Sequence, residues 1–330
     1  MKKKDMKKGI TFILTRLLVI ILLLTLSLSL AGCKGKNQGK QGKVEEQVNS
    51  ADYSVIKKEV IGKLLEDNPS PGISSIGGDW LIFAFAKSGE EIPDTYLDAY
   101  YDNVRAEVKR KKGVLSDSKY TEYERVILSL ESIGKDFRNI EGYDLYPYLD
   151  DYEKVFGQGV NAEIFALITS NVCGIEVENE ERYLKDVISE LNQPLYMDDP
   201  EMTDYLSMGI EALSFYMDSA EAKAFVDESV KKLSEAQLAD GSLGNCESTA
   251  ECIIALSQIG IDPLKDERFI KEGKTLYDGL MVFYKGEGGF THMAPGDERI
   301  KNEVDPMSSE KALLGLCALE LSQQGKRLYE

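Results

Sequence analysis

The sequence of 330 residues is poor in the residue types that build disulfide frameworks and metal centres. It has five cysteines, one histidine and one tryptophan. Cysteine is too scarce for a disulfide scaffold, although Cys246 and Cys252, with five residues between them, could form one bridge in an oxidising compartment. No stretch has a convincing β-strand pattern. The hydrophobic residues, 43% of the chain, are sufficient for the core of one large domain or two modest ones.

Basic residues are also in deficit, with 39 Lys and Arg against 57 Asp and Glu. Six of the basic residues and one acidic residue precede position 33, so the chain without residues 1–32 has a formal net charge of −23. A surface this acidic argues against nucleic acid or another polyanion as the main partner. Solubility at a crowded cell surface explains the charge more simply than a cationic ligand does.

The N-terminus has the pattern of an export signal. Lysines and Arg16 precede an apolar run from Leu17 to Leu30, which is short for a bilayer span. The four residues Leu30-Ala31-Gly32-Cys33 resemble the lipobox of bacterial lipoproteins, and this resemblance implies that Cys33 becomes the new N-terminus and carries diacylglycerol. An ordinary secretory signal with an incidental cysteine and an uncleaved anchor helix are the alternatives.

The predicted organisation therefore has three parts. Residues 1–32 are a lipoprotein signal peptide, and residues 33–50 are a flexible polar tether beginning at lipidated Cys33. Residues 51–330 are the folded domain. We expect the protein to lie outside the cytoplasm, attached to the bacterial cell membrane through its lipid.

One pattern recurs six times in the folded part: a polar start followed by an apolar helix with a small residue and then a large one. Helices that are apolar nearly all round are typically buried. The six copies are "DWLIFAFAKSG" from Asp79, "TEYERVILSLESIG" from Thr121, "VNAEIFALITS" from Val160, "DYLSMGIEALSFY" from Asp204, "STAECIIALSQIG" from Ser248 and "SSEKALLGLCALEL" from Ser308.

Amphipathic, charged segments with one apolar stripe separate the six copies and predict surface helices. They span Tyr53–Asp67, Pro93–Lys112, Tyr143–Val155, Asn179–Leu191, Ala220–Gln237 and Asp266–Tyr284. Six buried and six surface helices in alternation close most simply into a double ring. The predicted fold is all-α, an (α/α)6 toroid with six inner and six outer helices.

With these repeats the chain resembles the α/α-toroid superfamily of terpenoid cyclases, protein prenyltransferase β subunits, complement thioester domains and cobalamin carriers. Within it, the chain resembles bacterial surface proteins with prenyltransferase or squalene-cyclase repeats. Gln237 and Gly241 occupy the places of the Gln and Gly in the cyclase repeat motif, whereas Leu243 stands where that motif has Trp. The resemblance implies a site in the central cavity, near the N-terminal ends of the inner helices.

The catalytic motifs of these families are absent from the sequence. It has no Asp-x-Asp-Asp acid for a protonating cyclase, and the nearest text to a thioester Cys-Gly-Glu-Gln is Cys173-Gly174-Ile175-Glu176. The single histidine, His292, has no Asp-x-Cys partner for zinc and is expected to have a loop role. No catalytic residue, metal or cofactor is therefore predicted.

Two further chemistries remain as alternatives to binding. Toroids of six helical pairs also serve sugar-active hydrolases and lyases that use paired carboxylates, and Asp79, Asp204 and Glu247 lie near predicted inner-helix starts. A terpenoid cyclase or prenyltransferase-like enzyme using the central cavity is the other alternative.

The preferred prediction is a membrane-anchored lipoprotein whose toroid binds a small molecule, a glycan or a protein partner and performs no chemistry. Trp80 is expected to stack on a flat ligand or to pack the barrel, and Asn161 to contact ligand or to cap a helix. The candidate ligand residues lie in or just before the first turns of inner helices: Trp80, Tyr123, Arg125, Gln158, Asn161, Asp204, Tyr205 and Glu247.

Overall fold

A computed structural model describes residues 50–294 and 303–330. Within these residues the chain forms α-helices, short 3₁₀ helices and isolated β-bridges, and no strand. The prediction of an all-α fold is confirmed. The predicted signal peptide, Cys33 and the predicted tether up to residue 49 lie outside the described residues.

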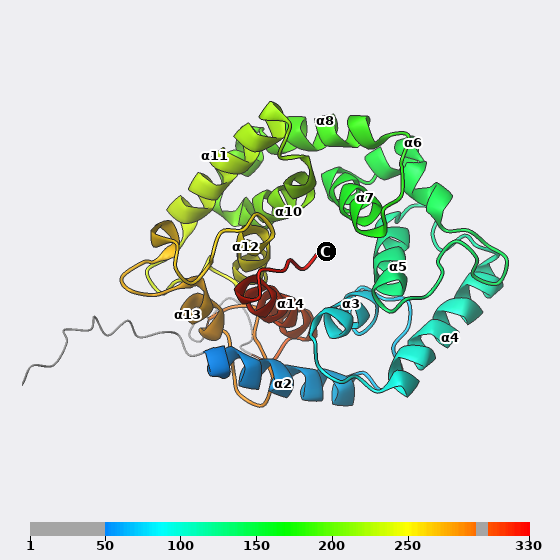
Figure 1. The fold of residues 1–330 in the computed structure, drawn as a ribbon, viewed down its shortest axis with the longest axis horizontal. Helices are drawn as coiled ribbons and strands as arrows, with labels where there is room; N and C mark the ends of the chain where they lie inside the picture. Colours follow the sequence, from blue (N-terminus) through cyan, green and yellow to red (C-terminus); the bar gives the residue numbers. More distant parts are fainter. Residues whose placement is uncertain (1–49, 295–302) are drawn as a thin grey trace, which may run out of the picture. The chain divides into compact units, whose positions relative to one another are not determined.

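Within the described residues, six helices surround a common axis, and each corresponds to one copy of the repeated apolar pattern (Figure 1). Each contacts the next, and the last also contacts the first, so the described part of the chain contains a closed inner ring. Its members are α3 (Asp79–Lys87), α5 (Thr121–Ser132), α7 (Val160–Cys173), α10 (Thr203–Leu213), α12 (Cys246–Gln258) and α14 (Pro306–Gln323).

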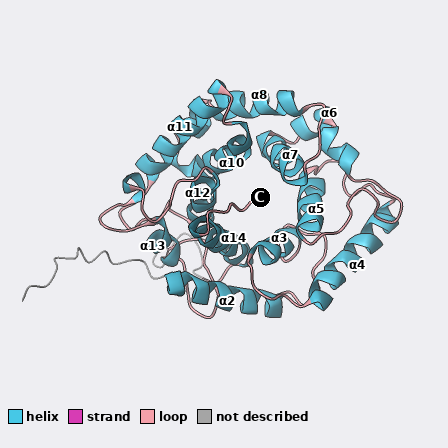
Figure 2. Ribbon diagram, viewed as in Figure 1, coloured by secondary structure: helices cyan, strands magenta, loops and turns pink. Residues whose placement is uncertain are grey.

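A second layer of helices lies outside this ring (Figure 2). Their apolar stripes pack against the inner helices, as the buried residues Tyr100, Val104 and Val108 of α4 illustrate. The core therefore lies between the two layers. The outer helices are α2 (Ser50–Asp67), α4 (Asp94–Lys111), α6 (Tyr152–Phe156), α8 (Glu180–Leu191), α11 (Ala220–Ala236) and α13 (Leu276–Met281).

The short elements lie in the connections. They are η1 (Tyr146–Asp150), α9 (Pro194–Met197), η2 (Pro200–Met202), η3 (Ser214–Tyr216) and η4 (Glu267–Phe269). No helix within residues 50–294 and 303–330 is both long and apolar enough to cross a membrane.

The inner helices begin at the same end of the ring. Side chains in their first turns reach each other: Arg125 of α5 pairs with Asp79 of α3, and Ser308 of α14 donates to Glu247 of α12. The other end is marked by the C-terminal segment, where the backbone N–H of Tyr329 donates to Gln258 in the last turn of α12. The ring thus has an N-terminal rim and a C-terminal end.

Two predicted surface helices are much shorter than expected. The segment Tyr143–Val155 forms η1 and α6, because Pro147 lacks the N–H that an α-helix needs in its interior. The segment Asp266–Tyr284 forms η4 and α13, separated by a tight turn in which Glu272 and Gly273 have positive φ angles of 49° and 80°. Two successive residues with positive φ end a helix. The predicted lengths of both surface helices were therefore wrong.

Candidate functional site

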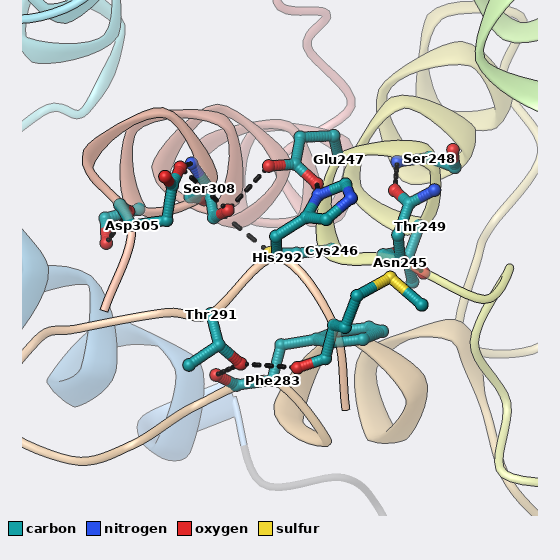
Figure 3. Close-up of polar contacts among 12 residues, drawn as sticks. Asn245, Cys246, Glu247, Ser248, Thr249, Phe283, Thr291, His292, Asp305 and Ser308 are labelled. Carbon is teal, nitrogen blue, oxygen red and sulfur yellow. Dashed lines mark hydrogen bonds and ion pairs between the residues drawn. The ribbon is translucent and has the colours of Figure 1, made fainter. Parts of the chain in front are cut away.

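The N-terminal rim contains a hydrogen-bonded cluster centred on Glu247 (Figure 3). Nδ1 of His292 lies 2.6 Å from Oε2 of Glu247, so the ring N–H donates to the carboxylate. The other oxygen, Oε1, accepts a 2.5 Å hydrogen bond from the Ser308 hydroxyl. Glu247 therefore joins a loop residue to the start of α14.

Helix caps fix the members of this cluster. Asn245 is the N-cap of α12 and its side chain accepts from the backbone N–H of Ser248 at 2.7 Å. Asp305 is the N-cap of α14 and accepts from the backbone N–H of Ser308 at 2.9 Å. N-cap side chains satisfy backbone N–H groups that have no partner inside the helix. The caps thus set the positions of Glu247 and Ser308 in the first turn of each helix.

The loop that carries His292 is held by its backbone. The carbonyl oxygen of His292 accepts from the backbone N–H of Cys246 at 3.0 Å, at the start of α12. The side chain of His292 is 38% exposed, whereas that of Glu247 is 15% exposed. Glu247 is consequently the less exposed of the two side chains, and solvent reaches His292 more easily.

A second group of charges lies beside this cluster. Lys311 of α14 forms an ion pair with Glu251 of α12, and its Nζ lies 5.6 Å from the ring centroid of Trp80, within the range of a cation–π contact. Burial alone would lower the pKa of Lys311, but the negative charges of Glu251, Glu211 and Glu247 raise it. Lys311 therefore remains an ammonium ion that balances carboxylates near the ring axis.

Side chains from opposite sides of the ring meet on its axis. Trp80 of α3 contacts Phe165 of α7, a helix that is not its neighbour in the ring, with ring centroids 5.1 Å apart. Phe83 of α3 stacks on Tyr329 at 5.8 Å, and the Tyr329 hydroxyl donates to Oε2 of Glu211 in α10 at 3.1 Å. These contacts cross the interior of the ring, and the Glu247 cluster at the rim is the candidate site.

Five predicted ligand residues lie near the starts of inner helices with partly exposed side chains. Asp204 and Tyr205 are in the first turn of α10, and burial raises the pKa of Asp204. Trp80 is half-buried, with one face against Phe165. Glu247 is the centre of the cluster already described. Asn161 is also half-buried in the first turn of α7, and the N-cap of that helix is Gly159, so Asn161 does not cap it.

Tyr123 and Gln158 have structural contacts that the sequence analysis did not anticipate. The Tyr123 ring is fully buried and stacks on Tyr148 at 3.9 Å, and its hydroxyl donates to the Ser116 carbonyl at 2.9 Å. The Gln158 amide donates to Thr121 Oγ1 at 2.9 Å and its oxygen accepts from the N–H groups at the start of α5. Both side chains hold inner helices in place, so we interpret them as structural residues rather than as ligand contacts.

Arg125 belongs to a buried ion pair. Its Nε lies 3.3 Å from Oδ2 of Asp79, and the Tyr100 hydroxyl of α4 donates to Oδ1 of the same carboxylate at 2.9 Å. Burial raises the pKa of Asp79 to about 7, against the opposing effects of Arg125 and Tyr100. This network connects α3, α4 and α5, so we interpret Arg125 as structural rather than as a ligand contact.

The sequence analysis did not identify several rim residues as candidate site residues. His292 was assigned to a loop without a partner, and Ser308, Lys311 and Glu251 were not considered. Glu247 and Glu251 are four residues apart on one helix, which places them on the same face. Ser308 and Lys311 lie in the first two turns of the sixth inner helix, so the rule that selected the other candidates also applied to them.

The cysteines within the described residues are free thiols. Cys246, Cys252 and Cys317 are buried and Cys173 is half-buried, so the possible Cys246–Cys252 bridge is not formed. Burial raises the pKa of these thiols, and a thiol is a weak nucleophile compared with a thiolate. Within residues 50–294 and 303–330, no group of His, Cys, Asp and Glu side chains is arranged to hold a metal ion.

Comparison with known proteins gives no family. No protein-family model matches this chain, and no curated protein matches it.

Proposed function

We propose that this chain is a binding protein of the α/α-toroid type, anchored outside the cytoplasm through a lipid on Cys33. In this proposal the N-terminal rim of the inner ring binds a small molecule, a glycan or a protein partner, and no covalent chemistry follows. The observation that carries the proposal is the Glu247 cluster, in which a carboxylate, a histidine and a hydroxyl are held together at the rim close to the Lys311–Trp80 contact.

The composition of the rim indicates the ligands to test first. Glu247, Asp204 and Glu251 bring three carboxylates near one cation, Lys311. A site with surplus negative charge favours neutral or cationic ligands over anions. An aromatic face next to hydrogen-bonding groups suits a sugar ring or a flat ring system, as Trp80 provides. Neutral glycans and basic peptides are therefore the leading ligand classes.

The order of residues in the cluster supports binding over nucleophilic catalysis. A serine nucleophile is activated when a histidine removes its proton while a carboxylate orients that histidine. Here the carboxylate lies in the middle, because Ser308 and His292 each bond to Glu247 and not to each other. The Ser308 hydroxyl thus has an acceptor, but the histidine is not placed as its base.

A second pair of carboxyl groups, Glu211 and Glu251, is also explained by contacts within the protein. Burial together with the charge of nearby Glu251 raises the pKa of Glu211 well above its usual value. Tyr329 donates to Glu211 and Lys311 pairs with Glu251. Glycosidases keep two carboxyl groups free to face a sugar across a cleft, and this pair is engaged by protein side chains.

Trp80 provides the readout for the test of binding. It is the only tryptophan in the sequence, so fluorescence excited selectively from tryptophan, and not from the 17 tyrosines, reports on the rim. Titration of the full-length chain in detergent with neutral glycans, basic peptides, cobalamins and polyprenyl compounds should give a saturable change for one class. Glu247→Gln should weaken that binding, whereas Glu153→Gln, which changes an exposed carboxylate on α6, should not.

Catalysis would be recognised in the same experiment. If a ligand that changes the fluorescence is also converted to product, and Glu247→Gln or Glu251→Gln abolishes turnover while binding remains, the proposal of a pure binding protein is wrong. Absence of a response from every class would contradict the rim as the binding site.

The anchor is tested separately. Cells expressing the full chain should incorporate labelled fatty acid into it, and Cys33→Ala should abolish the label and release the protein from the membrane fraction. Recovery of unlabelled wild-type protein from the cytosol would contradict the anchor and leave the rim proposal intact.

A further inference from the structure

Exposed apolar side chains gather at the N-terminal rim of the ring. Within the described residues, eight large apolar side chains are 39–55% exposed. Seven of them lie in or beside the segments that lead into inner helices, here called the entry segments, and each inner helix has at least one. The seven are Ile76 before α3, Val114 before α5, Phe156 before α7, Leu195 before α10, Leu238 before α12, and Val304 and Met307 at the start of α14.

The eighth side chain lies at the opposite end of the ring. It is Val55 of α2, and Lys57 of the same helix donates to the carbonyl of Ser88, which follows the C-terminus of α3. Single exposed apolar residues are ordinary on a protein surface, whereas a face that collects them is typical of an interaction surface. The distribution therefore singles out the N-terminal rim.

Half-buried aromatic residues extend the apolar surface at two of these positions. Leu195 is followed by Tyr196, whose ring centroid lies 5.2 Å from that of Tyr205 in the first turn of α10. Phe156 stacks on Tyr152 with centroids 5.4 Å apart. Aromatic residues are enriched in protein–protein interfaces and often supply much of the binding energy. These rings are held by contacts within the domain, so a partner would find them already in place.

The charges among these apolar residues are negative on one half of the rim. In the entry segments of α10, α12 and α14, residues 192–202, 237–245 and 303–305 include no basic residue. A surface of this sign repels an anionic membrane, and it also repels the same face of a second copy, which a two-fold dimer would bring against it. It attracts a basic partner. The six acidic residues of these ranges are Asp198, Asp199, Glu201, Asp240, Glu303 and Asp305.

The place where the predicted tether joins the domain also favours a protein partner over the membrane. The tether precedes α2, and Lys57 in the second turn of α2 pairs with Glu320 near the end of α14 as well as bonding to Ser88. The start of α2 therefore lies at the C-terminal end of the ring. In the proposed anchored protein this end is nearer the membrane, and the N-terminal rim is open to another protein.

We propose that the N-terminal rim docks a protein whose contact surface combines basic and apolar side chains. This inference rests on the proposed binding function and names the class of its partner. Apolar side chains of the partner cover Leu195, Leu238 and Phe156, and its basic side chains face the carboxylates between them. Burial of apolar surface supplies affinity, and complementary charge sets the orientation. The partner is a protein because it must span several entry segments, which a small molecule does not.

The experiment is photocrosslinking in the bacterium that makes the protein, with the full-length chain. The photoreactive residue p-benzoyl-phenylalanine replaces Leu195 or Leu238 at the rim. Val55 is the matched control site, because it is 53% exposed and Leu195 is 55% exposed. On illumination both rim sites should crosslink to one and the same protein, and the Val55 site should not. Mass spectrometry should place the crosslink beside lysine or arginine and apolar residues of that protein.

Charge reversal tests the electrostatic part of the proposal. Glu201→Lys, in the chain with the photoreactive residue at position 195, should lower the crosslink yield about fivefold, the effect of one strong exposed charge pair. Glu91→Lys changes an exposed carboxylate that follows α3 at the C-terminal end of the ring. This control variant should keep the yield of the parent chain.

Four results would overturn the proposal. A crosslink from the rim to lipid would make the membrane the occupant, and a crosslink to another copy of this chain would make it a dimer interface. An equal crosslink from Val55 would show no preference for the rim. No crosslink from either rim site, with circular dichroism showing both variants folded, would leave the rim without a protein partner.

Failure of this proposal and failure of the proposed function are distinguishable. If Trp80 fluorescence responds to a glycan and no protein crosslinks at the rim, the binding function stands and the protein partner is wrong. If the partner crosslinks at Leu195 and Leu238 but Glu247→Gln leaves the yield unchanged, the docking surface stands and the Glu247 cluster is not part of it.

Discussion

The hydroxyl of Tyr329 donates a 3.1 Å hydrogen bond to Oε2 of Glu211. Tyr329 follows the last inner helix and Glu211 belongs to α10, so the bond spans residues that are 118 positions apart in the sequence. The same tyrosine stacks on Phe83 of α3, and its N–H donates to Gln258 of α12. One residue of the C-terminal segment therefore contacts three inner helices at the ring axis.

This arrangement predicts that Tyr329 contributes strongly to stability. Tyr329→Phe removes the hydrogen bond to a buried carboxyl and should lower the free energy of unfolding by about 1–3 kcal/mol. Tyr329→Ala also removes the ring stacked on Phe83 and should cost about 3–5 kcal/mol. Urea denaturation followed by circular dichroism measures both values. Equal stability of the alanine variant and the wild type would show that the C-terminal segment does not support the ring.

The Lys311–Glu251 pair predicts a non-additive result. Lys311→Met leaves the Glu251 carboxylate, whose side chain is 6% exposed, without its cation, and should cost about 3–5 kcal/mol. Replacing both residues with methionine removes the unpaired charge and should recover most of that loss. Denaturation of the two single variants and the double variant forms a double-mutant cycle. Additive losses would indicate that the ion pair contributes no coupling energy.

Glu163 predicts a pH dependence of stability. Burial and the neighbouring charge of Asp186 raise its pKa from 4.5 to about 7. The folded state therefore holds the proton more tightly than the unfolded chain does. Its stabilising effect is complete below pH 4.5 and is lost as the pH rises through about 7.

The variant Glu163→Gln keeps the shape of the side chain and removes its titration. It should match the wild type near pH ~4 and exceed it near pH ~8, by an amount on the order of 3 kcal/mol for a shift of this size. Thermal unfolding across this pH range measures the difference. Glu153→Gln, at an exposed site on α6, should follow the wild-type curve throughout. A stability gain in Glu163→Gln that is the same at both ends of the range would rule out titration as its cause.

The inner helices were predictable because each is apolar on nearly all sides, and such helices rarely occur outside a core. The same property concealed which side of each helix faces the axis. Tyr123 and Arg125 both lie in the start of α5, yet Tyr123 packs on Tyr148 and Arg125 pairs with Asp79. A periodic pattern gives no direction when every side is apolar, so the sequence could not show that these two side chains bond within the protein.

The rim was only partly predictable for a different reason. Glu247 was identified from its place at a helix start, but its partner His292 is 45 residues away on a loop. The loop is held against α12 by a hydrogen bond from the Cys246 N–H to the His292 carbonyl. Every residue has these backbone groups, so the residue types in the sequence do not reveal this bond. Lys311 and Ser308 followed the same positional rule as Glu247 and could have been included.

Backbone packing around α13 leads to the last prediction. A Cβ added to Gly279 would lie 2.2 Å from the carbonyl carbon of Gly241, a backbone atom that cannot rotate away. Gly279→Ala should therefore destabilise the fold by about 1–3 kcal/mol or more, as overpacking does. Gly62 is the matched control, because it also lies in a helix, α2, and an added Cβ meets nothing within 4 Å. Gly62→Ala should raise stability by about 0.5–1 kcal/mol, since alanine loses less conformational entropy in a helix than glycine does. Denaturation of the two variants should shift in opposite directions, and a gain in stability for both would mean that α13 does not pack against the Gly241 turn as described.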